Sequence, residues 1–352
     1  MSRVAALLGV AALTLGPAAA RSSGTPPASP PSLIRGVALG HLGRASHATL
    51  DRRLGEIRAL GATHVSLTVT WSMRDVRRHT IAPHQGRTPT DAELLWLMAQ
   101  ARARGLQVML FPIVEVERRK PLEWRGTLRP DDWGRWWLSY RRFILHYARL
   151  SARGRAAIYC VGSELVSTEG QRGRWAELLA AVRQVFAGPL LYSANWDHYA
   201  PVGHWDLVDI IGLTAYHQLT TRRDASEHEL ATSWARLRDG LVAWAQRQRR
   251  PIVFTEVGYP SIDGGALHPW DYTQPAAVDL EEQRRAFSAF VSAWSDVPEL
   301  AGVFVWDWYG DGGPSDRGYT PRGKPAQRVL EAWFSRAARA ELPARRDLRH
   351  LP

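Results

Sequence analysis

Eight short apolar segments recur along the chain, and most are followed by a longer segment with helical periodicity. The apolar segments span residues 33–39, 63–69, 106–113, 157–162, 189–195, 208–216, 251–256 and 301–308. The helical patterns span residues 49–60, 90–104, 130–152, 172–186, 227–248, 279–295 and 324–336. Near-continuous apolar strands are typical of parallel sheets covered on both faces, and eight strands close a barrel. The sequence therefore predicts one α/β domain with a (β/α)8 TIM barrel fold.

An open doubly wound sheet is the alternative arrangement for such a pattern. It would normally carry a glycine-rich phosphate loop, but neither G-x-G-x-x-G nor G-x-x-x-x-G-K-[ST] occurs in the sequence. One irregularity affects the barrel: only about a dozen residues separate the segments at 189–195 and 208–216. We expect the helix between these two strands to be short or absent.

The first twenty residues read as a secretory signal peptide. They combine a basic start at Arg3, an apolar run from Val4 to Leu15 and an Ala-Ala-Ala cleavage site. A membrane anchor is the alternative, but the run is shorter than the roughly 20 residues that a span requires, and no later segment is long enough. We expect residues 21–32 to be a Pro/Ser-rich linker, 33–338 the catalytic barrel and 339–352 a basic tail. The protein would be exported to the periplasm or the medium.

The net charge of +11 comes mainly from arginine. The arginines are scattered and form no recognisable nucleic-acid-binding motif, so we expect a solvated basic surface and no nucleic-acid partner. Attraction to anionic cell-surface polymers is the alternative role for this charge. The histidines show no metal-ligand spacing, and the single cysteine, Cys160, lies inside an apolar segment. We expect a monomer without metal or cofactor.

In a (β/α)8 barrel, functional residues lie where the strands end at their carboxyl termini. The residues at these positions are Trp71, Ser163, Glu164, Asn195, Trp196, Tyr216, Glu256 and Trp306. Glu164 and Glu256 follow strands that face each other across the barrel. Retaining glycoside hydrolysis uses two carboxyl groups about 5 Å apart, while aromatic faces and polar groups hold the sugars. This pattern predicts a polysaccharide- or oligosaccharide-cleaving site.

Glu115 and Glu117 form a second pair of acids, after the segment at 106–113. They are positioned either to bind substrate hydroxyls or to form salt bridges with Arg118 and Arg119, and we favour the salt bridges.

Six segments make the chain resemble glycoside hydrolase family 113. They read RTPTDAELLWLMAQARARGLQVMLFP, WRGTLRPDDWGRWWLSYRRFILHYARL, YCVGSELVSTEG, LLYSANWDHY, DLVDIIGLTAY and VFTEVGYPS, and RGYTPRGKPA follows the last strand. The resemblance extends over most of residues 33–335. It implies a retaining β-mannanase with a (β/α)8 barrel, acting on β-1,4-mannan by double displacement without a cofactor.

The resemblance also implies roles for individual residues. Glu164 would be the acid/base and Glu256 the nucleophile, Tyr216 would hydrogen-bond the nucleophile, and Trp306 would form the floor of the subsite where cleavage occurs. Ser163 stands where the larger clan often has Asn, so Asn195 is expected to share the contact with the sugar 2-hydroxyl. In this assignment the pKa of Glu164 is raised and that of Glu256 is lower.

Two other functions remain open at this point. TEVGYPS also resembles the nucleophile motif of plant-type β-1,3-glucanases of the same clan, so a β-1,3- or other β-glucanase is one alternative. A non-catalytic glycan-binding barrel is the other.

Overall fold

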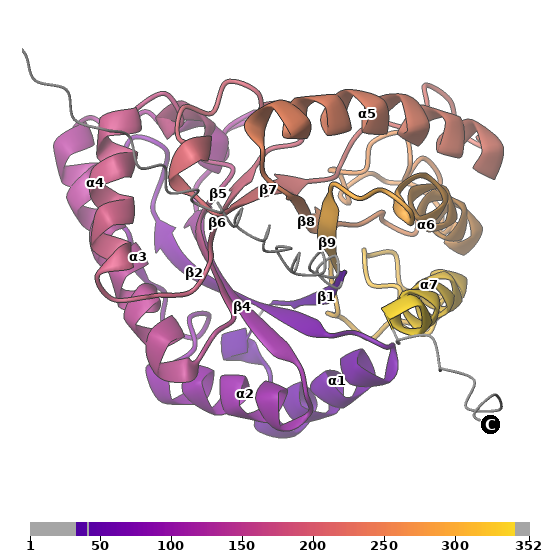
Figure 1. Cartoon of the computed structure of the whole chain (residues 1–352), viewed down its shortest axis with the longest axis horizontal. Helices are drawn as coiled ribbons and strands as arrows, with labels where there is room; N and C mark the ends of the chain where they lie inside the picture. The colour runs from indigo at the N-terminus through magenta and orange to yellow at the C-terminus, as the bar shows by residue number, and fades with distance from the viewer. Residues whose placement is uncertain (1–32, 41, 342–352) are drawn as a thin grey trace, which may run out of the picture. The chain divides into compact units, whose positions relative to one another are not determined.

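The computed structural model describes residues 33–40 and 42–341, which form a closed parallel β-barrel surrounded by helices (Figure 1). The barrel strands are β1 (Ile34–Leu39), β2 (His64–Met73), β4 (Gln107–Val116), β5 (Ile158–Ser163), β6 (Leu190–Ala194), β7 (Ile210–Thr214), β8 (Ile252–Val257) and β9 (Leu300–Val305). The predicted signal peptide and linker lie outside the described residues, as does the tail beyond residue 341.

Strand pairing closes the barrel through β1. The strands follow the order β1-β9-β8-β7-β6-β5-β4-β2, and β1 also pairs with β2, with Gly36 opposite His64 and Leu39 opposite Leu67. All these pairings are parallel, while the two-residue β3 (Ala82–Pro83) adds an antiparallel pairing to β2. The predicted (β/α)8 fold is therefore confirmed.

Helices cover the outside of this barrel. They are α1 (His47–Ala59), α2 (Asp91–Ala103), α3 (Trp133–Gly154), α4 (Arg172–Arg183), α5 (Glu227–Gln248), α6 (Leu280–Trp294) and α7 (Pro325–Glu341). Short polar side chains define several helix starts: Thr90 and Glu93 form a capping box at α2, and Ser226 and Glu229 form another at α5. Gly105, with a φ of 73°, follows the end of α2.

The connection from β6 to β7 contains only a 3-10 turn at Trp205–Leu207 among its regular elements. This agrees with the short spacing in the sequence. At the other end of the barrel domain, α7 continues to Glu341, three residues past the boundary expected at residue 338. None of the helices in the described part of the chain combines the length and the apolar character that a bilayer span requires.

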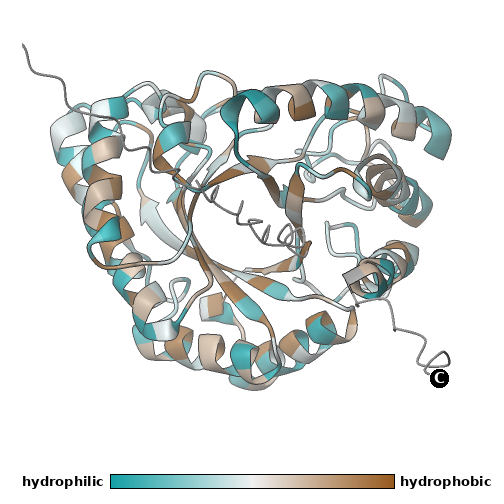
Figure 2. Ribbon diagram, viewed as in Figure 1, coloured by the Kyte–Doolittle hydropathy of each residue, from teal (hydrophilic) through white to brown (hydrophobic). Residues whose placement is uncertain are grey.

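Two apolar layers stabilise the barrel, and Figure 2 shows the strands as a largely hydrophobic ring. The larger layer lies between strands and helices, where Trp136 and Trp137 of α3 are buried against Tyr140 and Trp175. The smaller layer fills the barrel and consists of Met109, Phe111, Ile113, Ile158, Cys160, Leu191, Val253 and Phe304. Because side chains alternate along a strand, neighbouring residues enter different layers.

Candidate active site

Glu256 lies near the end of β8 and is almost completely buried, with 3% of its surface exposed. Tyr216, which follows β7, donates a 2.8 Å hydrogen bond from its hydroxyl to Glu256 Oε2. Burial raises the pKa of Tyr216 well above its usual value, so the phenol stays protonated and remains a donor. This is the contact that the family resemblance implies for Tyr216, while the catalytic roles of both residues stay a prediction.

Glu164 follows β5 directly and is also buried. Its φ is 53°, in the left-handed region that residues other than glycine rarely adopt. Its backbone N–H donates to the carbonyl of Ser193 on the neighbouring strand at 2.8 Å, which fixes the unusual turn. Strained backbone of this kind concentrates at functional sites because the surrounding structure must hold it.

Arg125 connects the two carboxyl groups electrostatically. It lies in a 3-10 turn at Arg125–Thr127, between β4 and α3, and donates a 2.5 Å hydrogen bond to Glu164 Oε2. Burial on its own would lower the pKa of Arg125, but the charges of Glu164 and Glu256 raise it above its usual value. The guanidinium is therefore charged, contacts Glu164 and interacts electrostatically with Glu256.

The pKa of Glu256 is raised, contrary to the lower value expected from the sequence. Burial is the main cause, and the nearby charge of Glu164 adds to it. Arg125 and the hydrogen bond from Tyr216 act in the opposite direction. Two buried carboxyl groups that repel each other electrostatically resist ionising together, and the positive guanidinium partly relieves this repulsion.

Trp306 immediately follows β9 and packs against the apolar filling of the barrel. Its backbone N–H donates to the carbonyl of Val257 at 2.8 Å, so it lies beside the residue after Glu256. Gly258 permits this approach, because a Cβ there would be 2.5 Å from the carbonyl oxygen of Trp306. Trp306 and Arg125 also line one cleft of about 430 Å³.

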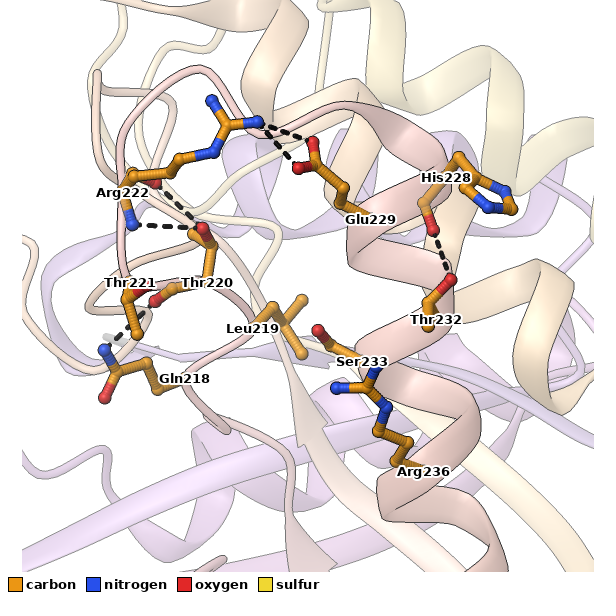
Figure 3. A pocket seen from close by; sticks show the side chains of 10 residues that line it. All are labelled: Gln218, Leu219, Thr220, Thr221, Arg222, His228, Glu229, Thr232, Ser233 and Arg236. Atoms are coloured by element: carbon orange, nitrogen blue, oxygen red, sulfur yellow. Dashed lines mark hydrogen bonds and ion pairs between the residues drawn. The ribbon is translucent and has the colours of Figure 1, made fainter.

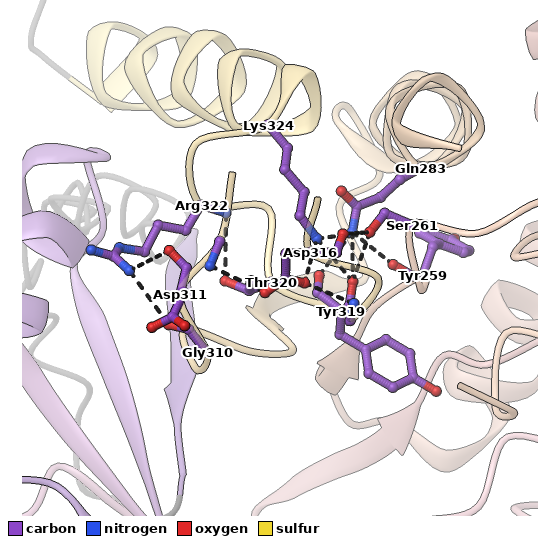
Figure 4. Close-up of polar contacts among 12 residues, drawn as sticks. Tyr259, Ser261, Gln283, Gly310, Asp311, Asp316, Tyr319, Thr320, Arg322 and Lys324 are labelled. Carbon is purple, nitrogen blue, oxygen red and sulfur yellow. Dashed lines mark hydrogen bonds and ion pairs between the residues drawn. The ribbon is translucent and has the colours of Figure 1, made fainter. Parts of the chain in front are cut away.

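The connection between β9 and α7 is fixed by a buried lysine (Figure 4). Lys324 Nζ donates to Ser261 Oγ at 2.8 Å, to Asp316 Oδ1 at 2.9 Å and to the carbonyl of Gly318 at 3.1 Å. These bonds join the chain after β8 to the chain after β9. Because Glu256 lies near the end of β8 and Trp306 directly follows β9, the lysine links the two segments that continue from them.

Asn195 and Trp196 follow β6. Asn195 Nδ2 donates to Asp197 Oδ1 at 2.5 Å, and the backbone N–H of Trp196 donates to Thr214 Oγ1 at 3.1 Å. The Trp196 ring stacks on Trp270, with ring centroids 5.4 Å apart and planes inclined by 19°. Trp270 is 43% exposed. The stacked pair offers an aromatic surface for a sugar ring.

Ser163 precedes Glu164 and is buried. Its Oγ has no hydrogen-bond partner within the described part of the chain, and Oε1 of Glu256 is in the same condition. Buried polar atoms are normally paired, so these two oxygens, one on the acidic pair and one on the residue before Glu164, mark positions where a bound polar group could supply the missing hydrogen bonds.

Trp71 does not lie with the other predicted site residues. Its indole Nε1 donates to the hydroxyl of Tyr147 at 3.1 Å, and its ring packs against Phe143 and His146, all on α3. The side chain therefore lies between β2 and α3 rather than at the mouth of the barrel, and its predicted role in substrate binding is wrong. The reason is that β2 continues to Met73, so Trp71 is not at its end.

Glu115 and Glu117 have other partners than expected. Glu115 Oε1 accepts a 2.9 Å hydrogen bond from Arg87, and Glu117 lies 3.8 Å from the ring nitrogen of His84. The predicted salt bridges with Arg118 and Arg119 do not form in the described structure.

A separate hollow of about 550 Å³ lies between the chain after β7 and the first turns of α5 (Figure 3). Its lining includes Arg222, which is held by both carboxylate oxygens of Glu229, but neither Arg125 nor Trp306. Because Arg125 pairs with Glu164 and lines the cleft of about 430 Å³, we associate the two glutamates with that cleft. Within residues 33–40 and 42–341, no cluster of three or more His, Cys, Asp or Glu side chains is arranged to hold a metal ion.

Arg125 is the main functional residue that the sequence prediction missed. It lies in a connection of irregular structure, where no strand end marks it. The segment WRGTLRP, which the family resemblance included, was the signal that could have identified it.

Comparisons with known proteins identify a family and similar solved structures. Residues 39–324 match the family model of Glycoside Hydrolase Family 113. The structure of a GH113 beta-mannanase from Alicyclobacillus acidocaldarius is 29% identical with a TM-score of 0.78, and the alignment covers 87% of this chain and 98% of that one. A search of curated proteins found no match.

Two further solved structures share the fold alone, since they are less similar in sequence. A GH113 beta-1,4-mannanase is 23% identical with a TM-score of 0.75, covering 86% of this chain and 99% of that one. A GH5_18 protein from Streptomyces cattleya, solved with Manb1-4GlcNAc, is 19% identical with a TM-score of 0.58, covering 90% and 82%.

Proposed function

We propose that this chain, which belongs to glycoside hydrolase family 113, is a retaining glycosidase that cleaves β-1,4-mannan or a related β-mannan. The observation that carries the proposal is the buried arrangement of Glu256, its donor Tyr216, and the Arg125–Glu164 pair. The similarity to the beta-mannanase from Alicyclobacillus acidocaldarius supports the choice of sugar.

The reaction would proceed in two displacements. Glu256 attacks the anomeric carbon while Glu164 gives its proton to the leaving glycosidic oxygen, which forms a glycosyl-enzyme ester. Glu164 then removes a proton from water, and the water attacks the same carbon and releases Glu256. Tyr216 holds the nucleophile in place, and Arg125 helps to keep Glu256 ionised beside a second carboxyl group.

Substrate contacts follow from the surrounding residues. Trp306, which lines the cleft, would form an apolar floor, and we assign a second sugar contact to the aromatic surface of the Trp196–Trp270 stack. Ser163 Oγ is the buried donor nearest in sequence to Glu164, and Asn195 is held by Asp197 after the next strand. We assign to these two the hydrogen bonds to sugar hydroxyls.

We also propose that the protein is exported by its N-terminal signal peptide, on the strength of the sequence pattern alone. Fractionation of expressing cells should place the mature protein in the periplasm or the medium. Its N-terminal sequence should begin near Arg21. A full-length protein retained in the cytoplasm would contradict this.

The central experiment compares the wild type with Glu256→Ala on mannan, glucomannan, xylan, and β-1,3- and β-1,4-glucans, with reducing ends measured over time. Release from mannan by the wild type alone is expected. Release from a β-1,3-glucan instead would favour the glucanase alternative, and near-normal activity of Glu256→Ala would overturn the assigned mechanism. Retention of anomeric configuration, followed by NMR, tests the double displacement directly.

A further inference from the structure

Arginines dominate the cleft that Arg125, the partner of Glu164, lines. Its lining contains Arg44, Arg87, Arg119 and Arg125, but only one acidic residue, Glu115. This cleft also contains Trp306, so a glycan seated at the proposed site would pass along it. The basic side chains are therefore part of the substrate path rather than of a remote surface.

The charges in this cleft do not balance. Arg87 is neutralised by Glu115, and Arg125 by Glu164. When Glu164 carries its proton and Glu256 is ionised, Arg125 and the pair together have no net charge. Arg44 and Arg119 are exposed, and neither has an acidic partner in the described structure. Among the residues that line the cleft, Arg44 and Arg119 therefore carry positive charges that no acidic side chain of the described structure pairs with.

A second hollow, of about 880 Å³, extends the basic surface. Residues 83–86 line it, and Arg87, next in sequence, lines the catalytic cleft. The second hollow contains Arg74 and Arg78, with Glu117 as its acidic residue. Arg78 lies 3.7 Å from Asp75, whereas Arg74 has no acidic partner in the part of the chain described. Positive charge thus continues outward from the cleft.

Guanidinium groups of this kind match a particular ligand chemistry. A neutral sugar is held by stacking and by uncharged donors and acceptors, and gains little from an unpaired arginine. A carboxylate or sulfate accepts two parallel N–H bonds from a guanidinium, which is a strong and directional contact. Like charges lining a cleft also attract a ligand of the opposite charge before contact.

We propose that the glycan cleaved by this protein carries anionic groups, either uronic acid carboxylates or sulfate esters, and that Arg44 and Arg119 bind them. The inference rests on the proposed glycosidase function and narrows its substrate class to acidic β-mannans.

The test measures kcat/KM on three oligosaccharide sets with the same β-1,4-mannan backbone: neutral, substituted with glucuronic acid, and sulfated. The wild type should prefer one of the charged sets by about tenfold or more, and the preference should shrink at high ionic strength. Arg44→Gln and Arg119→Gln should each lower kcat/KM on that set about fivefold more than on the neutral set. The set preferred identifies the anion.

Arg118→Gln is the matched control, because Arg118 is the exposed neighbour of Arg119 and does not line the cleft. It changes the net charge equally and should leave the preference intact. If the wild type has the same kcat/KM on the neutral set as on both charged sets, the inference is overturned, while the proposed function stands.

A binding measurement tests the anion site independently of the proposed glycosidase function. Affinities of Glu256→Ala for the same oligosaccharides, measured by calorimetry, do not depend on turnover. Tighter binding of a charged set, reduced by Arg119→Gln but not by Arg118→Gln, supports the anion site even if no backbone is cleaved. Equal affinity for neutral and charged sets overturns it.

Discussion

Arg125 and Glu164 are joined by a 2.5 Å hydrogen bond although they lie on different connections of the barrel. Arg125 belongs to the 3-10 turn between β4 and α3, whereas Glu164 directly follows β5. The guanidinium also lowers the pKa of Glu256 against the effect of burial. One side chain therefore influences the ionisation of the nucleophile while contacting the acid/base.

Arg125→Gln should move the acidic limb of the pH profile. The nucleophile must be ionised, so activity falls as the pH drops through the pKa of Glu256. Without the positive charge this pKa rises further, and the limb of kcat/KM should shift to higher pH by about one unit or more. Arg129→Gln, which alters an exposed arginine paired with Glu123, is the control. An unchanged limb in Arg125→Gln would refute this role.

Tyr216→Phe removes the single hydrogen bond that the structure shows on Glu256 Oε2. A hydrogen bond to a charged group contributes about 1.5–3 kcal/mol, so kcat should fall roughly ten- to a hundredfold, with a smaller change in KM. Steady-state kinetics on mannan oligosaccharides would measure this. Tyr272→Phe provides the comparison, since Tyr272 is 60% exposed. A loss confined to KM would instead indicate a sugar contact.

Glu256→Gln should stabilise the fold at high pH. Because the folded protein raises the pKa of Glu256, it binds that proton more tightly than the unfolded chain does. The unfolding free energy of the wild type therefore decreases as the pH rises from about 4.3, the ordinary glutamate value, through the raised pKa. Glutamine does not ionise and avoids this loss.

Urea unfolding of both proteins across this pH range provides the measurement. The variant should be more stable than the wild type by about 1 kcal/mol or more above the raised pKa, and the difference should diminish below pH of about 4. If the stability difference between the variant and the wild type does not change with pH, ionisation of the Glu256 carboxyl group is not its cause.

Lys324→Met should destabilise the protein by about 3 kcal/mol, because it leaves Asp316 without its partner in a partly buried site. The chain has one other lysine, Lys120, which is exposed, so Lys120→Met makes the same change without this network. That control should remain within about 0.5 kcal/mol of the wild type. Equal stability of the two variants in chemical unfolding would show that the buried lysine does not fix the β9–α7 connection.

The barrel was predictable because short apolar segments alternate with segments of helical periodicity along the chain. The segment expected at 157–162 corresponds to β5 at Ile158–Ser163, and that expected at 251–256 to β8 at Ile252–Val257. With the strand ends located, the barrel rule brings Glu164, Glu256 and Tyr216 to one opening.

Trp71 shows where this reasoning fails. The apolar run suggested an end near residue 69, but β2 continues to Met73. Side chains alternate between the two faces, so Leu67, Val69 and Trp71 all enter the layer beneath the helices, while Thr68 and Thr70 line the cleft. A strand end estimated from apolar residues does not reveal the direction in which its last side chain points.

The place of Arg125 and the raised pKa of Glu256 do not follow from the strand pattern, for a different reason. Both depend on the connection between β4 and α3, which places a guanidinium beside a residue 39 positions away. Neither propensity nor periodicity describes such contacts, and the burial that raises the pKa exists only once the whole barrel has closed.

The position of Cys160 has a practical consequence. It is the only thiol of the protein and is fully buried among the side chains that fill the barrel. A thiol reagent can reach it only when the barrel opens, so the rate of its modification reports that opening without any introduced label. A cysteine placed on the surface would react first, which makes the native protein a suitable host for attaching a single probe.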